Sequence, residues 1–312
     1  MIAPRPTLLV VFGPTGAGKS ELAQEVARRR AGEIVSADAF AVYRGLDIGT
    51  AKPSLERRAR VPHHMIDVAE PEEPFSAGRF AAEARPIVEA IAERGRLPIV
   101  CGGSGFYIAA LLGALPRGEA RDPGLREGLR NWAERRGAEA AHRFLERNDP
   151  VAASRIPVGN LRYTLRALEV LLATGAAASA RRPEGDAWSA KFRIVKVGLR
   201  PERAQLHVRI EDRVRRMLDE GWGEEVRRLL DRGLTGDSNS FQAIGYREVA
   251  EFLLGRISRQ QAEEQIVIAT RGLARRQETW FARERDAVWL APGEALAATL
   301  ELLEGGDERE TP

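Results

Sequence analysis

A string of eight residues constrains the fold more than any other part of this chain. Residues 13–20 read GPTGAGKS, which fits the pattern G-x-x-x-x-G-K-[S/T], and they follow the continuous apolar run TLLVVF at residues 7–12. A buried strand that runs into such a turn and then into a helix forms a phosphate-binding loop. Its backbone N–H groups and the positive end of the helix hold phosphate oxygens. The string therefore predicts a parallel α/β sheet with a phosphate site at its edge.

All eight residues of this loop are expected to line the phosphate site: Gly13, Pro14, Thr15, Gly16, Ala17, Gly18, Lys19 and Ser20. The Lys19 ammonium would bridge the outer phosphates, and the Ser20 hydroxyl would hold Mg²⁺. The competing interpretation is a Gly-rich turn that only starts a helix. The loop does not name the reaction, because it serves ATP or GTP most often but grips any diphosphate, including one that leaves a carbon centre.

The remaining pattern predicts a P-loop NTPase-like parallel sheet flanked by helices, with an all-helical insertion domain. Strands are expected at residues 33–36, 64–68 and 97–101, with a long helix capped by Ser76 and ending near residue 94. Helical stretches without a strand are expected at 124–136, 138–146 and 160–172. A strand at 192–199 returns to the sheet, followed by helices near 201–220, 222–232, 241–254 and 258–284 and a strand at 288–290. The predicted domains are 1–116, 117–190 and 191–312.

Composition excludes several classes of protein and gives a weak indication of an anionic partner. The 312 residues are 44% hydrophobic and 30% charged with one Cys, which excludes a disordered or disulfide-stapled chain. No apolar run approaches the length of a membrane span, so we expect a cytosolic protein without a membrane partner. Residues 181–216 hold eleven basic residues and five acids, a charge excess typical of nucleic-acid contact or of a solvated helix face. The acidic residues 301–312 are expected to be a disordered tail.

Two further turns carry candidate chemistry. Asp38 follows the second strand, which we expect beside the P-loop strand, and could orient Mg²⁺, act as a general base or cap a helix. Residues 101–107, CGGSGFY, repeat the order of strand, glycine turn and helix, and Ser104 offers a hydroxyl there. Lys52 is one of four lysines among 48 basic residues, which favours a contact to an anion.

Taken together, these strings resemble the tRNA dimethylallyltransferase family over about residues 7–290. The segments that carry the resemblance are GPTGAGKS, SADAFAVYRGLDIGTAKP, PHHMIDV, GGSGFYIAALL, RALEV, QAIGYRE and TRGLARRQETWF. The resemblance implies transfer of a dimethylallyl group from dimethylallyl diphosphate to N6 of the adenine immediately 3′ of the anticodon, in tRNAs that read codons starting with U. It implies Mg²⁺ as cofactor, and we expect a cytoplasmic monomer whose partners are the anticodon stem-loop of tRNA and dimethylallyl diphosphate.

The resemblance also implies roles for individual residues. Asp38 is the general base at the adenine amine, Ser104 stands where the family has Thr, and Arg213 reaches the diphosphate; these three are the predicted catalytic residues. The residues implied in tRNA binding are Asp38, Ala39, Phe40, Ala41, Ser104, Arg126, Arg162, Arg166, Gln242, Gly245, Tyr246, Arg247, Arg275 and Arg276. The target adenine would have to flip out of its stacked loop to reach the site.

Besides Ser104, the sequence departs from the family pattern at three places. Ala39 and Ala41 replace a Ser and a Gln of the family, and Tyr163 stands where Arg is common. The alternatives that stay open are a P-loop nucleotide kinase or NTPase, prenylation of free adenine nucleotides, and a catalytically impaired tRNA-binding protein. His63 and His64 are interpreted as structural, because no further metal ligand lies at the required spacing.

Overall fold

The structure is a computed structural model that describes residues 5–114, 123–180, 187–236 and 238–305. The chain divides into two compact units: a core unit of Met1–Leu111 with Ala187–Pro312, and a helical unit of Leu112–Asp186. The sequence analysis placed the insertion at 117–190, so this division begins and ends slightly earlier along the chain. The first residues of the predicted insertion, 117–122, lie outside the described residues.

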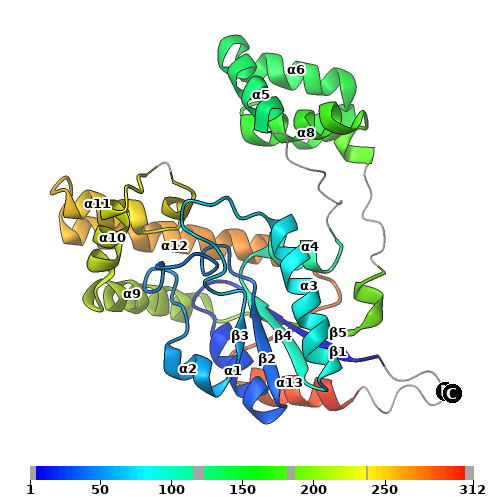
Figure 1. Ribbon diagram of the computed structural model, residues 1–312, viewed down its shortest axis with the longest axis vertical. Coiled ribbons are helices and arrows are strands. Elements are labelled where there is room, and N and C mark those ends of the chain that lie inside the picture. The colour runs from blue at the N-terminus through cyan, green and yellow to red at the C-terminus, as the bar shows by residue number, and fades with distance from the viewer. Residues whose placement is uncertain (1–4, 115–122, 181–186, 237, 306–312) are drawn as a thin grey trace. The chain divides into compact units, whose positions relative to one another are not determined.

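A six-stranded parallel sheet forms the centre of the core unit (Figure 1). Its spatial order is β3-β2-β4-β1-β5-β6, and every neighbouring pair is parallel. This confirms the predicted fold class. The prediction that the second strand lies beside the P-loop strand was wrong. Strand β4 lies between β1 and β2, so Asp38 is one strand further from the P-loop than expected. The strands are β1 (Thr7–Phe12), β2 (Gly32–Ser36), β3 (His63–His64), β4 (Leu97–Gly102), β5 (Arg193–Leu199) and β6 (Val288–Leu290).

Both faces of β1 are covered, which explains its unbroken apolar sequence. Leu9 and Val11 belong to a buried cluster with α1 (Lys19–Arg29) and α13 (Ala295–Glu304). On the opposite face, the ring of Phe12 stacks on Phe281 at 4.6 Å between centroids and meets Trp289 edge-on at 5.5 Å. The P-loop at the end of β1 is thus anchored by packing on both sides.

The rest of the core unit follows the predicted pattern of strands and helices, with three differences. Ser76 caps α3 as predicted, accepting a hydrogen bond from the Arg79 amide at 3.1 Å. The predicted strand 64–68 shrinks to β3, and the predicted helix 241–254 starts only at 246, after a 3₁₀ turn. Residues 301–304 are not a disordered tail: they end α13, where Leu303 is buried against the sheet; residues 306–312 lie outside the described part. These helices are α2 (Leu55–Arg60), α3 (Ala77–Glu93), α4 (Gly105–Leu111), α9 (Arg203–Asp219), α10 (Trp222–Asp231), α11 (Tyr246–Leu253) and α12 (Arg259–Phe281).

The helical unit has its own apolar core. Leu129, Leu145 and Leu168 are buried together, and no strand occurs among its described residues. Its helices are α5 (Pro123–Arg136), α6 (Ala138–Asn148), α7 (Pro150–Arg155) and α8 (Leu161–Thr174). Across residues 5–114, 123–180, 187–236 and 238–305, no helix has the length and apolar character needed to cross a bilayer.

Candidate active site

The P-loop joins β1 to α1, in the strand–turn–helix context that the sequence predicted. Gly13, Gly16 and Gly18 have φ angles of 146°, 81° and 92°, a region that side chains with a Cβ rarely adopt. A Cβ on Gly13 would also lie 2.7 Å from the carbonyl oxygen of Leu199 in β5. The loop therefore needs glycine both for its backbone conformation and for its close approach to the neighbouring strand.

The ammonium of Lys19 lies inside the P-loop, where it can bind an anionic ligand. Its Nζ donates to the carbonyl oxygen of Pro14 at 2.7 Å, inside its own loop. Burial lowers the pKa of Lys19 to about 8, and Arg213 acts in the same direction while Cys101 and Asp38 act against it. The next residue, Ser20, is exposed at the start of α1, and within the described part of the chain its hydroxyl has no hydrogen-bond partner.

Asp38 lies just beyond the end of β2 and uses one of its two oxygens locally. Oδ1 accepts hydrogen bonds from the amides of Phe40 at 2.9 Å and Ala41 at 3.1 Å. The cap interpretation was thus partly correct, since this carboxylate closes a turn. Among the described residues Oδ2 has no hydrogen-bond partner, so it stays available to a substrate. Ala41 is buried, whereas Ala39 and Phe40 are half-buried beside it.

The second glycine turn connects β4 to α4 and packs against the Asp38 segment. The amide of Ser104 donates to the carbonyl oxygen of Ala37 at 3.1 Å. A Cβ on Gly102 would lie 2.1 Å from the same oxygen, so only glycine permits this approach. Ser104 Oγ accepts from the Tyr107 amide at 3.4 Å, which leaves its hydroxyl proton free to donate. The sheet order thereby places Ser104 between the P-loop and Asp38.

Arg213 comes from α9 and completes the charged group around the P-loop. The guanidinium is partly buried, and within residues 187–236 and the other described segments it has neither an ion pair nor a hydrogen bond. Burial lowers the pKa of Arg213, while Asp38 and Glu21 favour its charged form. Helix α9 packs on the P-loop, where a Cβ on Gly16 would lie 3.2 Å from Leu206 and 3.4 Å from Ile210. Arg213, one turn after Ile210, lowers the pKa of Lys19, and Asp38 raises the pKa of both cations.

The depressed pKa of Lys19 predicts a pH-dependent affinity for diphosphate. The cationic form binds the anion, and it predominates in the free protein only below about pH 8. Above that pH, binding must take up a proton, so the affinity for inorganic pyrophosphate should fall by up to about tenfold per pH unit. Calorimetric titrations from about pH 7 to about pH 9.5 would measure this. Lys19→Arg, which stays charged, is the control for titration of the ligand itself; equal slopes for both proteins would contradict the prediction.

A buried carboxylate that the sequence analysis missed organises the loop after Asp38. Glu225 in α10 is 1% exposed and accepts from the amides of Asp47 at 2.7 Å, Ile48 at 2.7 Å and Gly49 at 3.1 Å. It also accepts from the hydroxyl of Tyr246 at 2.7 Å. In the sequence WGEEVRRLL, Glu225 cannot be told apart from the charged residues on the exposed face of an amphipathic helix. No local signal could therefore have identified it.

This arrangement corrects two of the predicted tRNA contacts. The side chain of Tyr246 is fully buried, and burial beside Glu225 raises its pKa well above the ordinary value. Gly245 is also buried, and a Cβ there would lie 2.0 Å from Trp222. Neither residue presents a side chain to RNA. Gln242 and Arg247, on either side of them, are exposed, and Arg247 donates to the carbonyl oxygen of Gly236 at 3.2 Å.

Lys52 does not face an anionic ligand, contrary to the expectation from its rarity. Its Nζ donates to the carbonyl oxygen of Tyr43 and to the carboxylates of Asp47 and Asp67, at 2.5, 2.8 and 2.5 Å. Its side chain is 1% exposed, so this lysine is an internal cross-link of the loop. His64 is likewise structural, because its Nε2 lies 2.7 Å from Glu33 Oε2. The described residues contain no cluster of His, Cys, Asp and Glu that could bind a metal ion.

The remaining predicted tRNA contacts fall on exposed or half-exposed basic residues. In the helical unit, Arg126 and Arg166 each form an ion pair of 2.9 Å with the buried carboxylate Glu169. Arg162 is exposed on α8, without an ion-pair partner among the described residues. In the core unit, Arg275 and Arg276 are exposed on α12. The predicted tRNA contacts therefore fall on both compact units of the chain.

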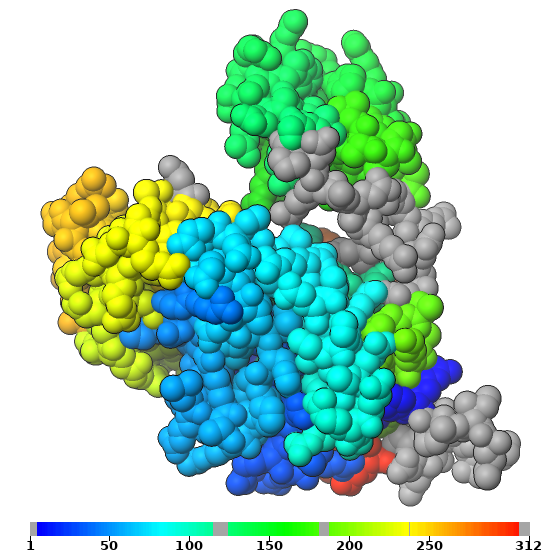
Figure 2. All heavy atoms as spheres, in the orientation of Figure 1, coloured from blue at the N-terminus to red at the C-terminus, as the bar shows by residue number. Residues whose placement is uncertain are grey.

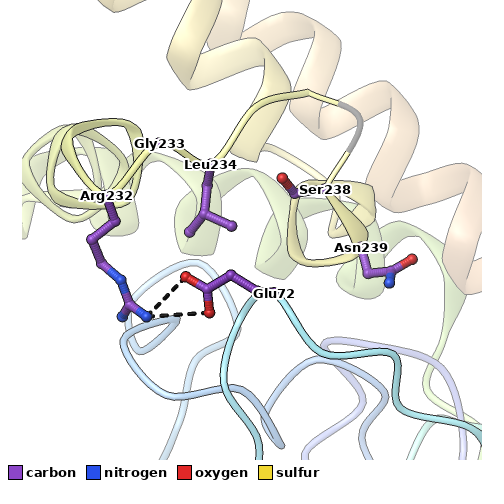
Figure 3. A pocket seen from close by; sticks show the side chains of 6 residues that line it. All are labelled: Glu72, Arg232, Gly233, Leu234, Ser238 and Asn239. Atoms are coloured by element: carbon purple, nitrogen blue, oxygen red, sulfur yellow. Dashed lines mark hydrogen bonds and ion pairs between the residues drawn. The ribbon is translucent and has the colours of Figure 1, made fainter.

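The core unit also has a pocket whose lining includes none of the predicted site residues. It is lined by Glu72 and by residues after α10, and Arg232 donates to Glu72 at 3.0 Å within it (Figure 3). Arg232 also bonds Glu70, which in turn accepts from Arg44. Figure 2 shows this contact region, where residues near 230–250, in yellow, lie against residues near 45–75, in blue and cyan. The two charged side chains of its lining, Arg232 and Glu72, are thus paired with each other.

Comparison with known proteins decides the family. The sequence model described as "IPP transferase" matches residues 41–284, and the one described as "Isopentenyl transferase" matches residues 6–68. The first of these matches covers more than half of the chain. The protein belongs to the IPP transferase family.

Similar proteins in this family cover nearly the whole chain. A "tRNA dimethylallyltransferase" of Desulfosudis oleivorans is 44% identical over 94% of this chain and 93% of its own. One from Methylococcus capsulatus is 45% identical over 92% and 93% of the two chains. The solved tRNA isopentenylpyrophosphate transferase of Bacillus halodurans has a TM-score of 0.71 and 35% identity, with 97% of each chain covered. A solved eukaryotic dimethylallyltransferase has a TM-score of 0.81 at 24% identity, and at this identity the similarity supports the fold alone.

Proposed function

We propose that this protein transfers a dimethylallyl group from dimethylallyl diphosphate to N6 of the adenine immediately 3′ of the anticodon, in tRNAs that read codons starting with U. The observation that carries the proposal is the convergence of Lys19, Asp38 and Arg213 at the carboxyl edge of the sheet. Lys19 and Arg213 have no carboxylate partner among the described residues, so both can stabilise a leaving diphosphate. Asp38 Oδ2 has no hydrogen bond within the same residues, so it can accept a proton from the amine. The names of the relatives support the same reaction.

The donor half of the site would bind the diphosphate. The amides of Thr15 and Ala17 already donate to Gln277 and Pro14, so the other amides of the P-loop and of the α1 N-terminus would hold the diphosphate oxygens. Lys19 and Arg213 would stabilise the charge that grows as the C–O bond breaks. The Ser20 hydroxyl, which has no hydrogen-bond partner among the described residues, would be a ligand of Mg²⁺. When bound, this ion would add further positive charge to the leaving group.

The acceptor half of the site would activate the adenine. The lone pair of N6 is delocalised into the ring, so the amine is a weak nucleophile until its proton is removed. Asp38 Oδ2 takes that proton as the N6–C bond forms and the diphosphate departs with the electrons of the C–O bond. Oδ1 stays fixed by the Phe40 and Ala41 amides, which holds the carboxylate in one orientation. The Ser104 hydroxyl, next to Asp38 in the sheet order, is a donor for the acceptor base.

The acceptor is proposed to be a whole tRNA because both units carry exposed arginines outside the site. Phosphate contacts of this kind supply affinity without reading sequence. The exposed aromatic ring of Tyr163 on α8, where the family commonly has Arg, replaces a charge by a surface that can stack on a base. A tRNA acceptor places the activity in the cytosol, and we propose that the protein acts there as a monomer.

Mass spectrometry of nucleosides tests the reaction directly. Unmodified tRNA is incubated with the protein, Mg²⁺ and dimethylallyl diphosphate, then digested. We expect a five-carbon addition to adenosine from tRNA, and none when free AMP is the acceptor. Unmodified tRNA that still binds would indicate a protein that only binds RNA, and modification of AMP would indicate the nucleotide as substrate. Phosphate release from ATP, with no prenyl transfer, would indicate the P-loop NTPase.

The charge arrangement in the helical unit predicts unequal effects of its arginines. Arg162→Ala removes an exposed guanidinium that no described carboxylate neutralises, so tRNA affinity should fall about three- to tenfold. The slope of log affinity against log salt concentration should become shallower by about one, because one fewer counterion is released on binding. Arg143→Ala is the matched control: it removes an exposed arginine of α6 that is paired with Glu139 at 3.6 Å, so it should change both quantities less. Filter binding over a range of salt concentrations measures both quantities. Equal losses for the two variants would indicate that charge alone, without a defined contact, attracts the RNA.

A further inference from the structure

The last turns of α12 dock onto both glycine turns of the site. Phe281 stacks on Phe12 at the end of β1, and a Cβ on Gly105 would lie 2.0 Å from Trp280 Nε1. One turn earlier, Gln277 projects between the two glycine turns. This helix therefore contacts both the loop that carries Lys19 and the turn that carries Ser104.

Gln277 makes one hydrogen bond to each turn. Its Oε1 accepts from the P-loop amide of Thr15 at 2.8 Å, and its Nε2 donates to the carbonyl oxygen of Gly103 at 3.0 Å. The two bonds use opposite ends of one planar amide, so their geometry fixes the separation of the two backbones. A side chain that only accepts or only donates could not form both bonds.

We propose that Gln277 is a positioning residue that sets the spacing between the donor half and the acceptor half of the active site. The proposal rests on the proposed function, because the P-loop holds the diphosphate and the turn at Ser104 faces the acceptor base. The bridge joins the backbone of the P-loop at Thr15 to the backbone of the β4–α4 turn at Gly103. A shift of about 1 Å between reacting groups is enough to lower a rate by about a hundredfold.

The contacts around Gln277 separate this role from a general role in folding. Phe281 is 1% exposed and Ala274 is 3% exposed, so apolar packing on either side already attaches α12 to the core unit. Gln277 itself is only half-buried. Its removal should therefore leave the helix in place and release the two turns from each other.

Gly103 gives an independent way to break the same bridge. A Cβ on Gly103 would lie 2.2 Å from Gln277 Nε2, and its three nearest neighbours are all atoms of Gln277. The φ angle of Gly103 is not in the positive region, so alanine fits the backbone there. Gly103→Ala should thus push the Gln277 amide aside, and it should meet no obstacle once the Gln277 side chain is gone.

The test compares prenyl transfer and pyrophosphate binding in four proteins: wild type, Gln277→Ala, Gly103→Ala and the double variant. We expect each single variant to lose about ten- to hundredfold in kcat, while inorganic pyrophosphate binds within about threefold of wild type. The double variant should be no slower than Gln277→Ala alone, because both changes remove the same bridge. Gln265→Ala, an exposed glutamine on the same helix, should match wild type.

Gln277→Glu tests the effect of a negative charge at this position on pyrophosphate binding. It keeps the acceptor for the Thr15 amide but points a carboxylate at the Gly103 carbonyl and at the diphosphate site. It should therefore weaken pyrophosphate binding by at least about tenfold, which Gln277→Ala does not. Multiplicative losses in the double variant, or wild-type kcat for both single variants, would overturn the proposal. A wild-type protein that binds pyrophosphate but transfers no prenyl group would instead overturn the proposed function.

Discussion

Asp38→Asn should lower kcat for prenyl transfer by about a hundred- to ten-thousandfold without weakening pyrophosphate binding. Asparagine keeps the Oδ1 atom that accepts from the Phe40 and Ala41 amides, so the turn after β2 should hold its shape. The amide cannot take a proton from adenine N6, and the lost step is the one that makes this amine a nucleophile. Single-turnover rates with dimethylallyl diphosphate and excess enzyme would measure the chemical step.

Two comparisons make this result specific to the base. Asp231→Asn neutralises an exposed carboxylate at the end of α10 and should leave the rate unchanged. Asp38→Asn should also bind inorganic pyrophosphate as wild type does, because the residues of the P-loop are unchanged. If Asp38→Asn transferred the prenyl group within about threefold of the wild-type rate, Asp38 would be a turn cap only.

The parts of the site that the sequence predicted are those encoded by short, contiguous strings. Glycine at positions 13, 16 and 18 and lysine at 19 describe a backbone conformation, and the structure has the positive φ angles and the strand–turn–helix context that they require. Asp38 and Ser104 were placed at the same edge because parallel strands all end there. Arg213 followed from the family resemblance, since nothing in an amphipathic helix marks one arginine as facing the sheet.

What the sequence could not predict depends on contacts between distant segments. Glu225 and the amides of residues 47–49 are far apart in the chain, and so are Gln277 and its two glycine turns. Polar side chains on helices look alike in sequence, whether they face water or a buried backbone group. The rarity of lysine was a poor guide to a ligand, because Lys52 pairs with Asp47 in its own loop and with Asp67, which lies beyond β3. The order of β2, β4 and β1 was likewise set by crossover connections that no motif encodes.

Lys19→Met should lower the affinity for inorganic pyrophosphate by at least about a hundredfold, and prenyl transfer with it. The ammonium is the one side-chain cation inside the P-loop, and the amides and Arg213 that remain cannot replace a charge that contacts the outer phosphate. Calorimetric titration with pyrophosphate measures the loss. Lys191→Met, which removes an exposed lysine paired with Glu89, should bind pyrophosphate as wild type does.

The same substitution should leave the thermal unfolding midpoint unchanged or higher, unlike most changes in a buried site. Burial lowers the pKa of Lys19 to about 8, so at neutral pH the fold disfavours the charge that it carries. Methionine fills similar space without that desolvation and gives up only the hydrogen bond to Pro14. The lysine is therefore kept at the expense of stability because the ligand requires it. A midpoint that fell by more than about 5 °C would mean that Lys19 holds the loop together instead.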